Sequence, residues 1–90
     1  RKTTSITKQT IDHKTVEVGV NISDKGILSA TANSPITKIS VQNEAGNSIK
    51  EIDIAEPAKT YSLDLNKFPQ GKIIIIFYTT EGEQSFTINN

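Results

Sequence analysis

The sequence predicts an all-β domain, and three observations support this prediction. The 90 residues include fourteen isoleucines, four valines and eleven threonines against three leucines, and β-branched side chains fit a pleated strand better than a helix. Several segments alternate apolar and polar residues, which is the period of a half-buried strand. No segment shows the 3.6-residue period of an amphipathic helix. A chain of this length forms a single domain, residues 1–90.

The first half of the chain predicts four strands. Residues 15–23 alternate strictly, with three valines and Ile22 on one face and polar residues or glycine on the other. A tight turn follows at Ser23–Gly26, and Pro35 is expected to break the next strand, because proline lacks a backbone donor and restricts the residue before it. The predicted strands are 4–11 at an edge, 15–23, 27–32 and 36–43, with Ile39 and Val41 directed inward.

The second half predicts two hairpins and a connecting strand. In the segment 48–54, Ile49 and Ile52 have opposite parity, which indicates a β-bulge or a twist that carries the strand from one face to the other. Glycine turns are expected near Gly46 and Gly82, where hairpin loops favour a positive φ. The predicted elements are strands over 48–54 and 61–65 separated by a loop over 56–59, a turn over 66–71 with Phe68 at one end of the core, and a final hairpin of 72–80 and 83–89.

Seven to eight short strands spaced by roughly 8 to 12 residues are typical of a two-sheet sandwich or a small barrel. We favour the sandwich. The sequence therefore predicts a small antiparallel immunoglobulin-like β-sandwich of seven to eight strands, with no repeats, linkers or low-complexity segments.

Composition argues against several classes of function. Ten basic and ten acidic residues give no net charge, and the basic residues are spread along the chain, so we expect no nucleic-acid partner. The absence of cysteine excludes disulfides and thiol chemistry. The longest apolar run, Ile73–Tyr78, is far shorter than the roughly 20 residues of a membrane-spanning helix. Because the chain begins at Arg1 and not Met, we expect either a processed product or a trimmed chain, from which any signal peptide or lipid anchor of the precursor has been removed.

No cluster of residues predicts catalysis or metal binding. His13 is the only histidine, and without cysteine or a second histidine it cannot supply the converging ligands of a metal site. A pairing of His13 with Asp12 or a distant serine is the remaining nucleophilic arrangement, and we favour an exposed turn histidine. The acidic residues on strands are expected to be solvated. We predict no enzyme, no cofactor, and no catalytic, cofactor-binding or metal residues.

From Ile36 onward, the order of features resembles a known family. "ITKISVQNEAGNSIKEIDI" gives a strand, a glycine turn and a return strand, and "YSLDLNKFPQGKIIIIFYTTEGEQSFTI" adds a "dLxxxPxG" connection before a long apolar strand and a last hairpin. This pattern is similar to a family of short exported proteins of the Bacteroides group that is classed as a domain of unknown function. It also resembles the related C-terminal sorting domains of the Por secretion system.

Two departures favour the uncharacterised family over the sorting domains. Ile73 stands where the sorting domains carry an aromatic residue, and the chain ends in "SFTINN" without Lys or Arg. The resemblance implies a small antiparallel sandwich in the periplasm, on the outer cell surface or outside the cell. It implies no catalytic or binding residues.

The run of four isoleucines, Ile73–Ile76, gives one strand two apolar faces. Counting from Gly71, alternation directs Ile73, Ile75 and Phe77 toward the core and Ile74, Ile76 and Tyr78 away from it. Two explanations are open: neighbouring Thr and Lys stems shield the second face, or it is a recognition patch. The candidate interaction face is Ile74, Ile76 and Tyr78. Because an uncharged β-forming segment is an aggregation hazard at an edge, we expect this strand in the sheet interior.

We therefore predict a non-catalytic exported accessory or protein-interaction module that binds a protein partner or a second copy of itself. One alternative is a C-terminal sorting or attachment domain. A second alternative is weak glycan binding through Tyr61 and Tyr78, which has little support because the chain contains no tryptophan.

Overall fold

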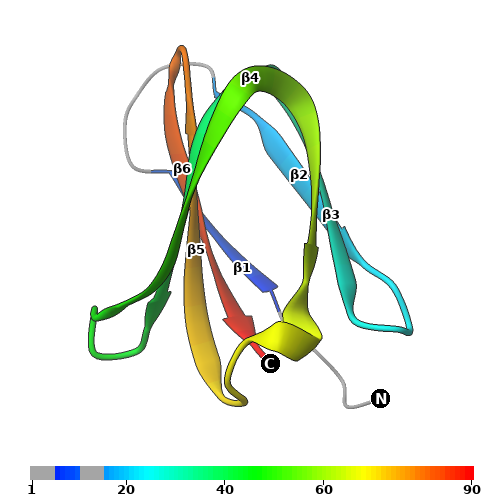
Figure 1. Cartoon of the computed structure of the whole chain (residues 1–90), viewed down its shortest axis with the longest axis vertical. Helices are drawn as coiled ribbons and strands as arrows, with labels where there is room; N and C mark the ends of the chain where they lie inside the picture. Colours follow the sequence, from blue (N-terminus) through cyan, green and yellow to red (C-terminus); the bar gives the residue numbers. More distant parts are fainter. Residues whose placement is uncertain (1–5, 11–15) are drawn as a thin grey trace.

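The computed structural model describes the backbone of residues 6–10 and all atoms of residues 16–90. The structure is all-β and every strand pairing is antiparallel, so this part of the prediction is confirmed (Figure 1). The elements are β1 Ile6–Thr10, β2 Val18–Ile22, β3 Ile27–Asn43, β4 Ser48–Asp64, a 3₁₀ turn η1 Leu65–Lys67, β5 Lys72–Thr79 and β6 Gly82–Asn89.

The strands form one curled sheet of order β1-β6-β5-β3-β2, and β4 pairs with the other edge of β3. The 17-residue strands β3 and β4 make a long hairpin that bends over as an arch with two limbs (Figure 1). One limb, the β2 limb, joins β2 to the first part of β3 and the last part of β4. The other, the β5 limb, joins β1, β6 and β5 to the second part of β3 and the first part of β4.

The structure corrects two predicted breaks. Residues 33–35 and 56–59 were expected to interrupt strands, but β3 and β4 run through them as bends with shifted register. At the first bend, β3 changes its partner on one edge from β2 to β5, and backbone hydrogen bonds are present on both sides of the change. The Asn33 N–H donates to the carbonyl of Glu17 at 3.0 Å, and the carbonyl of Pro35 accepts from the Thr80 N–H at 3.2 Å. The predicted strands 27–32 and 36–43 are thus one strand, β3, and the predicted strands 48–54 and 61–65 are one strand, β4. The described residues form six strands in one sheet, and a sandwich of seven to eight strands is not confirmed.

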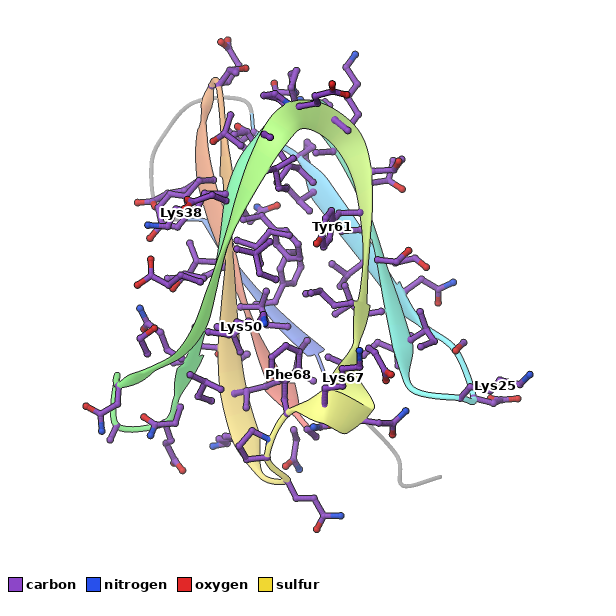
Figure 2. The ribbon with its side chains drawn as sticks, viewed as in Figure 1. Lys25, Lys38, Lys50, Tyr61, Lys67 and Phe68 are labelled. Atoms are coloured by element: carbon purple, nitrogen blue, oxygen red, sulfur yellow. The ribbon has the colours of Figure 1, made fainter. Side chains whose placement is uncertain are left out.

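The hydrophobic core lies between the two limbs and takes side chains from both (Figure 2). Ile39 and Val41 point inward and are fully buried, as predicted. Phe77 and Phe86 meet edge to face, with ring centroids 5.8 Å apart. Phe68 is half-buried against one end of this core, also as predicted. The buried apolar set is Val16, Val18, Leu28, Ala30, Ala32, Ile36, Ile39, Val41, Leu63, Leu65, Ile73, Ile75, Phe77, Phe86 and Ile88.

Polar side chains tie the ends of the arch together. Gln84 on β6 is fully buried, and its Oε1 accepts from the N–H of Val18 on β2 at 2.8 Å. At the opposite end, the Asn90 Nδ2 donates to the carbonyls of Leu65 at 3.0 Å and Pro69 at 3.1 Å. These bonds hold β2 against β6 and fix the connection between β4 and β5.

The predicted position of the isoleucine-rich strand is confirmed. β5 lies inside the sheet between β3 and β6, and β1 lies at an edge. The predicted bulge is also present: the register shifts between Val41 and Gln42, so that Ile49 is an extra residue on β4 and packs against the core. No helix in the described part of the chain is long and apolar enough to cross a membrane.

Candidate interaction face on the outside of strand β5

β5 has two apolar faces, one buried and one half-buried, as the alternation of side chains along the strand predicts. Ile73, Ile75 and Phe77 point into the core and are at most 1% exposed. The alternate residues Ile74, Ile76 and Tyr78 point to the outside of the sheet and are half-buried. We call these three the β5 strip. The structure brings the predicted residues together on one face, and their role in binding stays a prediction.

The β5 strip lies in the middle of three rows of side chains that cross β3, β5 and β6. Directly opposite residues of antiparallel strands share a face, so the pairing register defines each row. The rows are Lys38–Tyr78–Glu83, Ser40–Ile76–Ser85 and Gln42–Ile74–Thr87.

Small neighbours leave Ile76 as the main side chain at the surface of its row. Ser40 and Ser85 flank Ile76 on the outer face, yet they are only 3% and 4% exposed. Because serine is much shorter than isoleucine, the outer surface at this row consists mainly of Ile76. In the next row, the longer side chains of Gln42 and Thr87 flank Ile74 and are themselves half-buried. Neighbouring side chains therefore cover the flanks of the strip and leave a continuous apolar band along β5.

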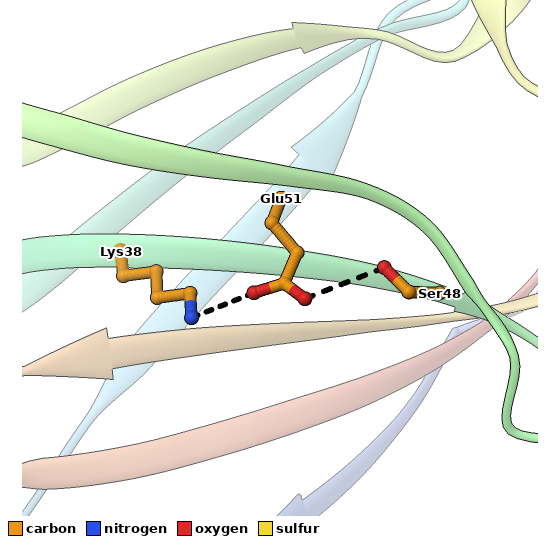
Figure 3. A network of polar contacts seen from close by, with 3 residues as sticks. All are labelled: Lys38, Ser48 and Glu51. Atoms are coloured by element: carbon orange, nitrogen blue, oxygen red, sulfur yellow. Dashed lines mark hydrogen bonds and ion pairs between the residues drawn. The ribbon is translucent and has the colours of Figure 1, made fainter.

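A charged network borders the band on the β4 side. The Lys38 Nζ lies 2.6 Å from the Glu51 Oε1, and the Ser48 Oγ donates to the Glu51 Oε2 at 3.5 Å (Figure 3). The same ammonium lies 5.8 Å from the ring centroid of Tyr78, within the range of a cation–π contact. The hydrogen bond and the charge of Lys38 lower the pKa of Glu51, and those of Glu51 raise the pKa of Lys38.

Two β-bulges position this network. The register of β3 against β5 shifts between Ile36 and Lys38, and the Thr37 Oγ1 at this bulge donates to the carbonyl of Tyr78 at 3.2 Å. The second bulge, at Ile49, returns Ser48 to the outer face only three residues from Glu51. Without that extra residue, the Ser48 hydroxyl would lie on the opposite face of β4.

The remaining candidates from the sequence form no site within the described residues. His13 and Asp12 lie outside the described residues. No group of three or more His, Asp or Glu side chains that could hold a metal ion occurs within the described residues. Tyr61 is half-buried against the core on the inside of the arch (Figure 2). Tyr78 lies on the outer face, as the burial alternation of β5 shows. The two tyrosines therefore do not share a face on which a sugar could stack.

Sequence reasoning did not find the residues that flank the strip. The β3 residues Lys38 and Ser40 lie 43 to 47 positions before the β6 residues Glu83 and Ser85, and only the strand register shows that all four border one band. The signal available from sequence was the alternation within each strand, which gives the face of a side chain but not its cross-strand neighbour.

Comparison of the chain with protein-family models, with curated proteins and with solved structures finds no match. The resemblance to exported proteins of the Bacteroides group therefore stays a prediction that rests on the quoted motifs of residues 36–88.

Proposed function

We propose that this domain is a non-catalytic, exported protein-interaction module that binds through the β5 strip. The observation that supports this most directly is the second apolar face of β5. The core needs only Ile73, Ile75 and Phe77, yet Ile74 and Ile76 keep the outside of the same strand apolar. A central apolar band with a charged rim is the usual anatomy of a protein interface.

The energy available is that of a modest interface. Full burial of two isoleucines from water contributes about 3 to 6 kcal/mol, and roughly half of that remains for half-buried side chains. Because association also costs translational freedom, the band supports weak or transient binding unless polar contacts add to it.

The export of the domain and its accessory role rest on the family resemblance. An immunoglobulin-like ancestry would fit the arch, in which two limbs face each other across one core as the layers of a sandwich do. The sorting and glycan-binding alternatives gain no specific support from the described residues. The last strand, β6, is enclosed between β1 and β5, and the two tyrosines lie on different faces.

Site-specific crosslinking combined with stability tests this proposal. A photo-crosslinking amino acid at Thr87, beside Ile74, should form covalent protein adducts in cells that produce the domain, and Ile74→Lys should abolish them. The same probe at exposed Lys59 of β4 is the matched control and should form none. Urea denaturation should show that Ile74→Lys lowers the free energy of unfolding by about 1 kcal/mol or less.

A second lysine variant calibrates the stability measurement. Ile75→Lys, one residue along, buries a charge in the core and should prevent folding. If Ile74→Lys also unfolds the protein, the strip serves folding and the proposal is wrong. The proposal is equally wrong if Thr87 forms no adducts, or if its adducts persist in the folded Ile74→Lys variant.

A further inference from the structure

A basic and an acidic residue lie on opposite sides of the β5 strip. In the Tyr78 row, Lys38 lies on one side of the tyrosine and Glu83 lies on the other. Both are half-buried side chains of the outer face, one on β3 and the other on β6. Lys38 and Glu83 therefore give the two strands that flank Tyr78 opposite charges, and on the β4 side of the row Asp53 lies directly beside Lys38.

We propose that the partner of the β5 strip is a second copy of this chain, packed face to face about a two-fold axis that runs along β5. This inference rests on the proposed function of the strip. A rotation about such an axis places β3 of one copy over β6 of the other. Lys38 of each copy then faces Glu83 of the other, and the two Tyr78 side chains meet at the axis. A two-fold interface requires this kind of self-complementary patch.

The other two rows match under the same rotation. In the Ile76 row, Ser40 would face Ser85 of the second copy, so small side chains meet and the two Ile76 side chains approach closely. In the Ile74 row, Gln42 would face Thr87, which pairs an amide with a hydroxyl. Each row thus places opposite charges, small side chains or hydrogen-bonding groups in contact.

Sheet geometry allows the three rows to remain in register. Aligned sheets cross at about 30°, and the Tyr78 row lies two residues, or roughly 6.6 Å, from the Ile76 row. If Ile76 is at the crossing point, the Tyr78 row is displaced sideways by only about 3 Å. A lysine and a glutamate side chain can span that displacement. Lys38 can also keep its contact with Glu51, because its ammonium has three donors.

The footprint sets the strength of association. Five strands about 4.8 Å apart and the eight residues of β5 cover roughly 500 Å² per copy, or about 1,000 Å² in total. Such an area is at the low end for specific complexes. The expected dimer is therefore weak and concentration-dependent, with a dissociation constant in or above the micromolar range.

Charge reversal measured by sedimentation velocity tests the arrangement. Lys38→Glu and Glu83→Lys should each weaken the dimer about tenfold or more, because each places like charges in contact twice. The double variant Lys38→Glu/Glu83→Lys restores opposite charges and should recover the wild-type dissociation constant to within about threefold. Lys59→Glu, away from the face, is the matched control and should leave association unchanged.

Two further measurements distinguish the Lys38–Glu83 contact between copies from the Lys38–Glu51 ion pair within one copy. Glu51→Gln removes the intramolecular partner of Lys38 but leaves the intermolecular one, so the dimer should persist. In the wild type, raising NaCl from about 0.05 M to about 0.5 M should weaken the dimer by screening the charge contacts. A dimer that resists both single reversals, or a double variant that stays dissociated, would overturn the proposed axis.

The outcomes also distinguish this inference from the proposed function. If the purified protein sediments as a monomer up to about 1 mM, but Thr87 adducts in cells depend on Ile74, the strip binds a different protein. The second copy is then wrong and the interaction module stands. If neither a dimer nor Ile74-dependent adducts are found, both proposals fail.

Discussion

Lys38 connects two strands on the outer face through one ammonium group. It forms an ion pair with Glu51 on β4 and lies over the ring of Tyr78 on β5. The two ion-pair side chains are 40% and 48% exposed, so solvent screens the pair, and its contribution to folding is small. The larger consequence is positional: the pair and the tyrosine hold the ammonium at the border of the apolar band.

The ion pair makes stability depend on pH in a defined direction. The pKa of Glu51 is lowered by its hydrogen bond to Lys38 and by the charge of that residue. A lowered carboxyl pKa contributes stability above the unfolded-state pKa of about 4.3, and that contribution is lost as the pH falls through the folded-state value. We expect the wild type to be slightly more stable than Glu51→Gln at neutral pH, with the difference vanishing in acid.

Urea denaturation of both proteins between neutral and acidic pH measures this difference. At alkaline pH, the raised pKa of Lys38 has the corresponding effect on stability: the contribution of the ion pair is lost as the pH rises through the folded-state pKa of the lysine. Asp53→Asn, beside Lys38 on the same face, is a control for general charge effects. A difference between wild type and Glu51→Gln that is constant with pH would contradict the assignment.

At the scale of elements, Gln84 is the direct polar connection between β6 and β2. Its carbonyl accepts the Val18 N–H on the side of β2 that pairs with no other strand within the described residues. Gln84→Met keeps the side-chain length but removes this acceptor. The buried N–H is then unpaired, and we expect a loss of about 1 to 3 kcal/mol in the free energy of unfolding.

Amide hydrogen exchange locates this effect. The Val18 amide should exchange much faster in Gln84→Met than in the wild type, and urea denaturation should show the global loss. Gln42→Met is the matched control, because Gln42 lies half-buried on the outer face away from β2, and it should change stability little. An unchanged Val18 exchange rate would show that the hydrogen bond does not hold β2 in place.

β4 shows how the fold protects its exposed edge. It pairs only with β3 within the described residues, so its other edge could recruit foreign strands. The stretch from Ala55 to Thr60 is exposed throughout and contains Pro57 and the charged residues Glu56 and Lys59. Proline and charge at an edge discourage strand addition. This protection favours the sheet face over the β4 edge as the surface for association.

Local patterns predicted most strands and faces but not the long strands. The alternation in 15–23 and the parity of Ile73–Phe77 follow from side chains of one strand, and the structure confirms both for the described residues. The sequence predicts a break at Pro35 where the structure has a bend, because the sequence does not show that Glu17 and Thr80 supply hydrogen-bond partners to the backbone there. The pairing of Lys38 and Glu83 across Tyr78 depends on the same non-local information, namely the register.

At the scale of the molecule, the arch depends on one shared core. Leu28, Leu63 and Leu65 come from the β2 limb and η1, whereas Ile75 and Phe77 come from the β5 limb, and all belong to one buried cluster. β3 and β4 also pass from one limb to the other without a flexible loop. Neither limb can expose its inner face without removing the apolar cover of the other.

This arrangement predicts that both limbs unfold together. The slowest-exchanging amides of β3 residues 28–32 and of β5 should report the same free energy of opening, equal to the global value from urea denaturation. Both sets should also depend equally on added denaturant, because both would require exposure of the whole core. Native-state hydrogen exchange followed by NMR, at several urea concentrations, measures these quantities.

The contrary result would be β2-limb amides that exchange through an opening of lower free energy and weaker urea dependence. The bend at residues 33–35 would then separate two units of unequal stability. Leu63→Ala distinguishes the two cases within one experiment, since this residue is 6% exposed and lies in the β2 limb. In a cooperative arch it lowers the protection of β5 amides by the full global loss of about 2 to 5 kcal/mol. In two separable units, the β5 amides keep their protection, and the strip that faces solvent on β5 would persist without the β2 limb.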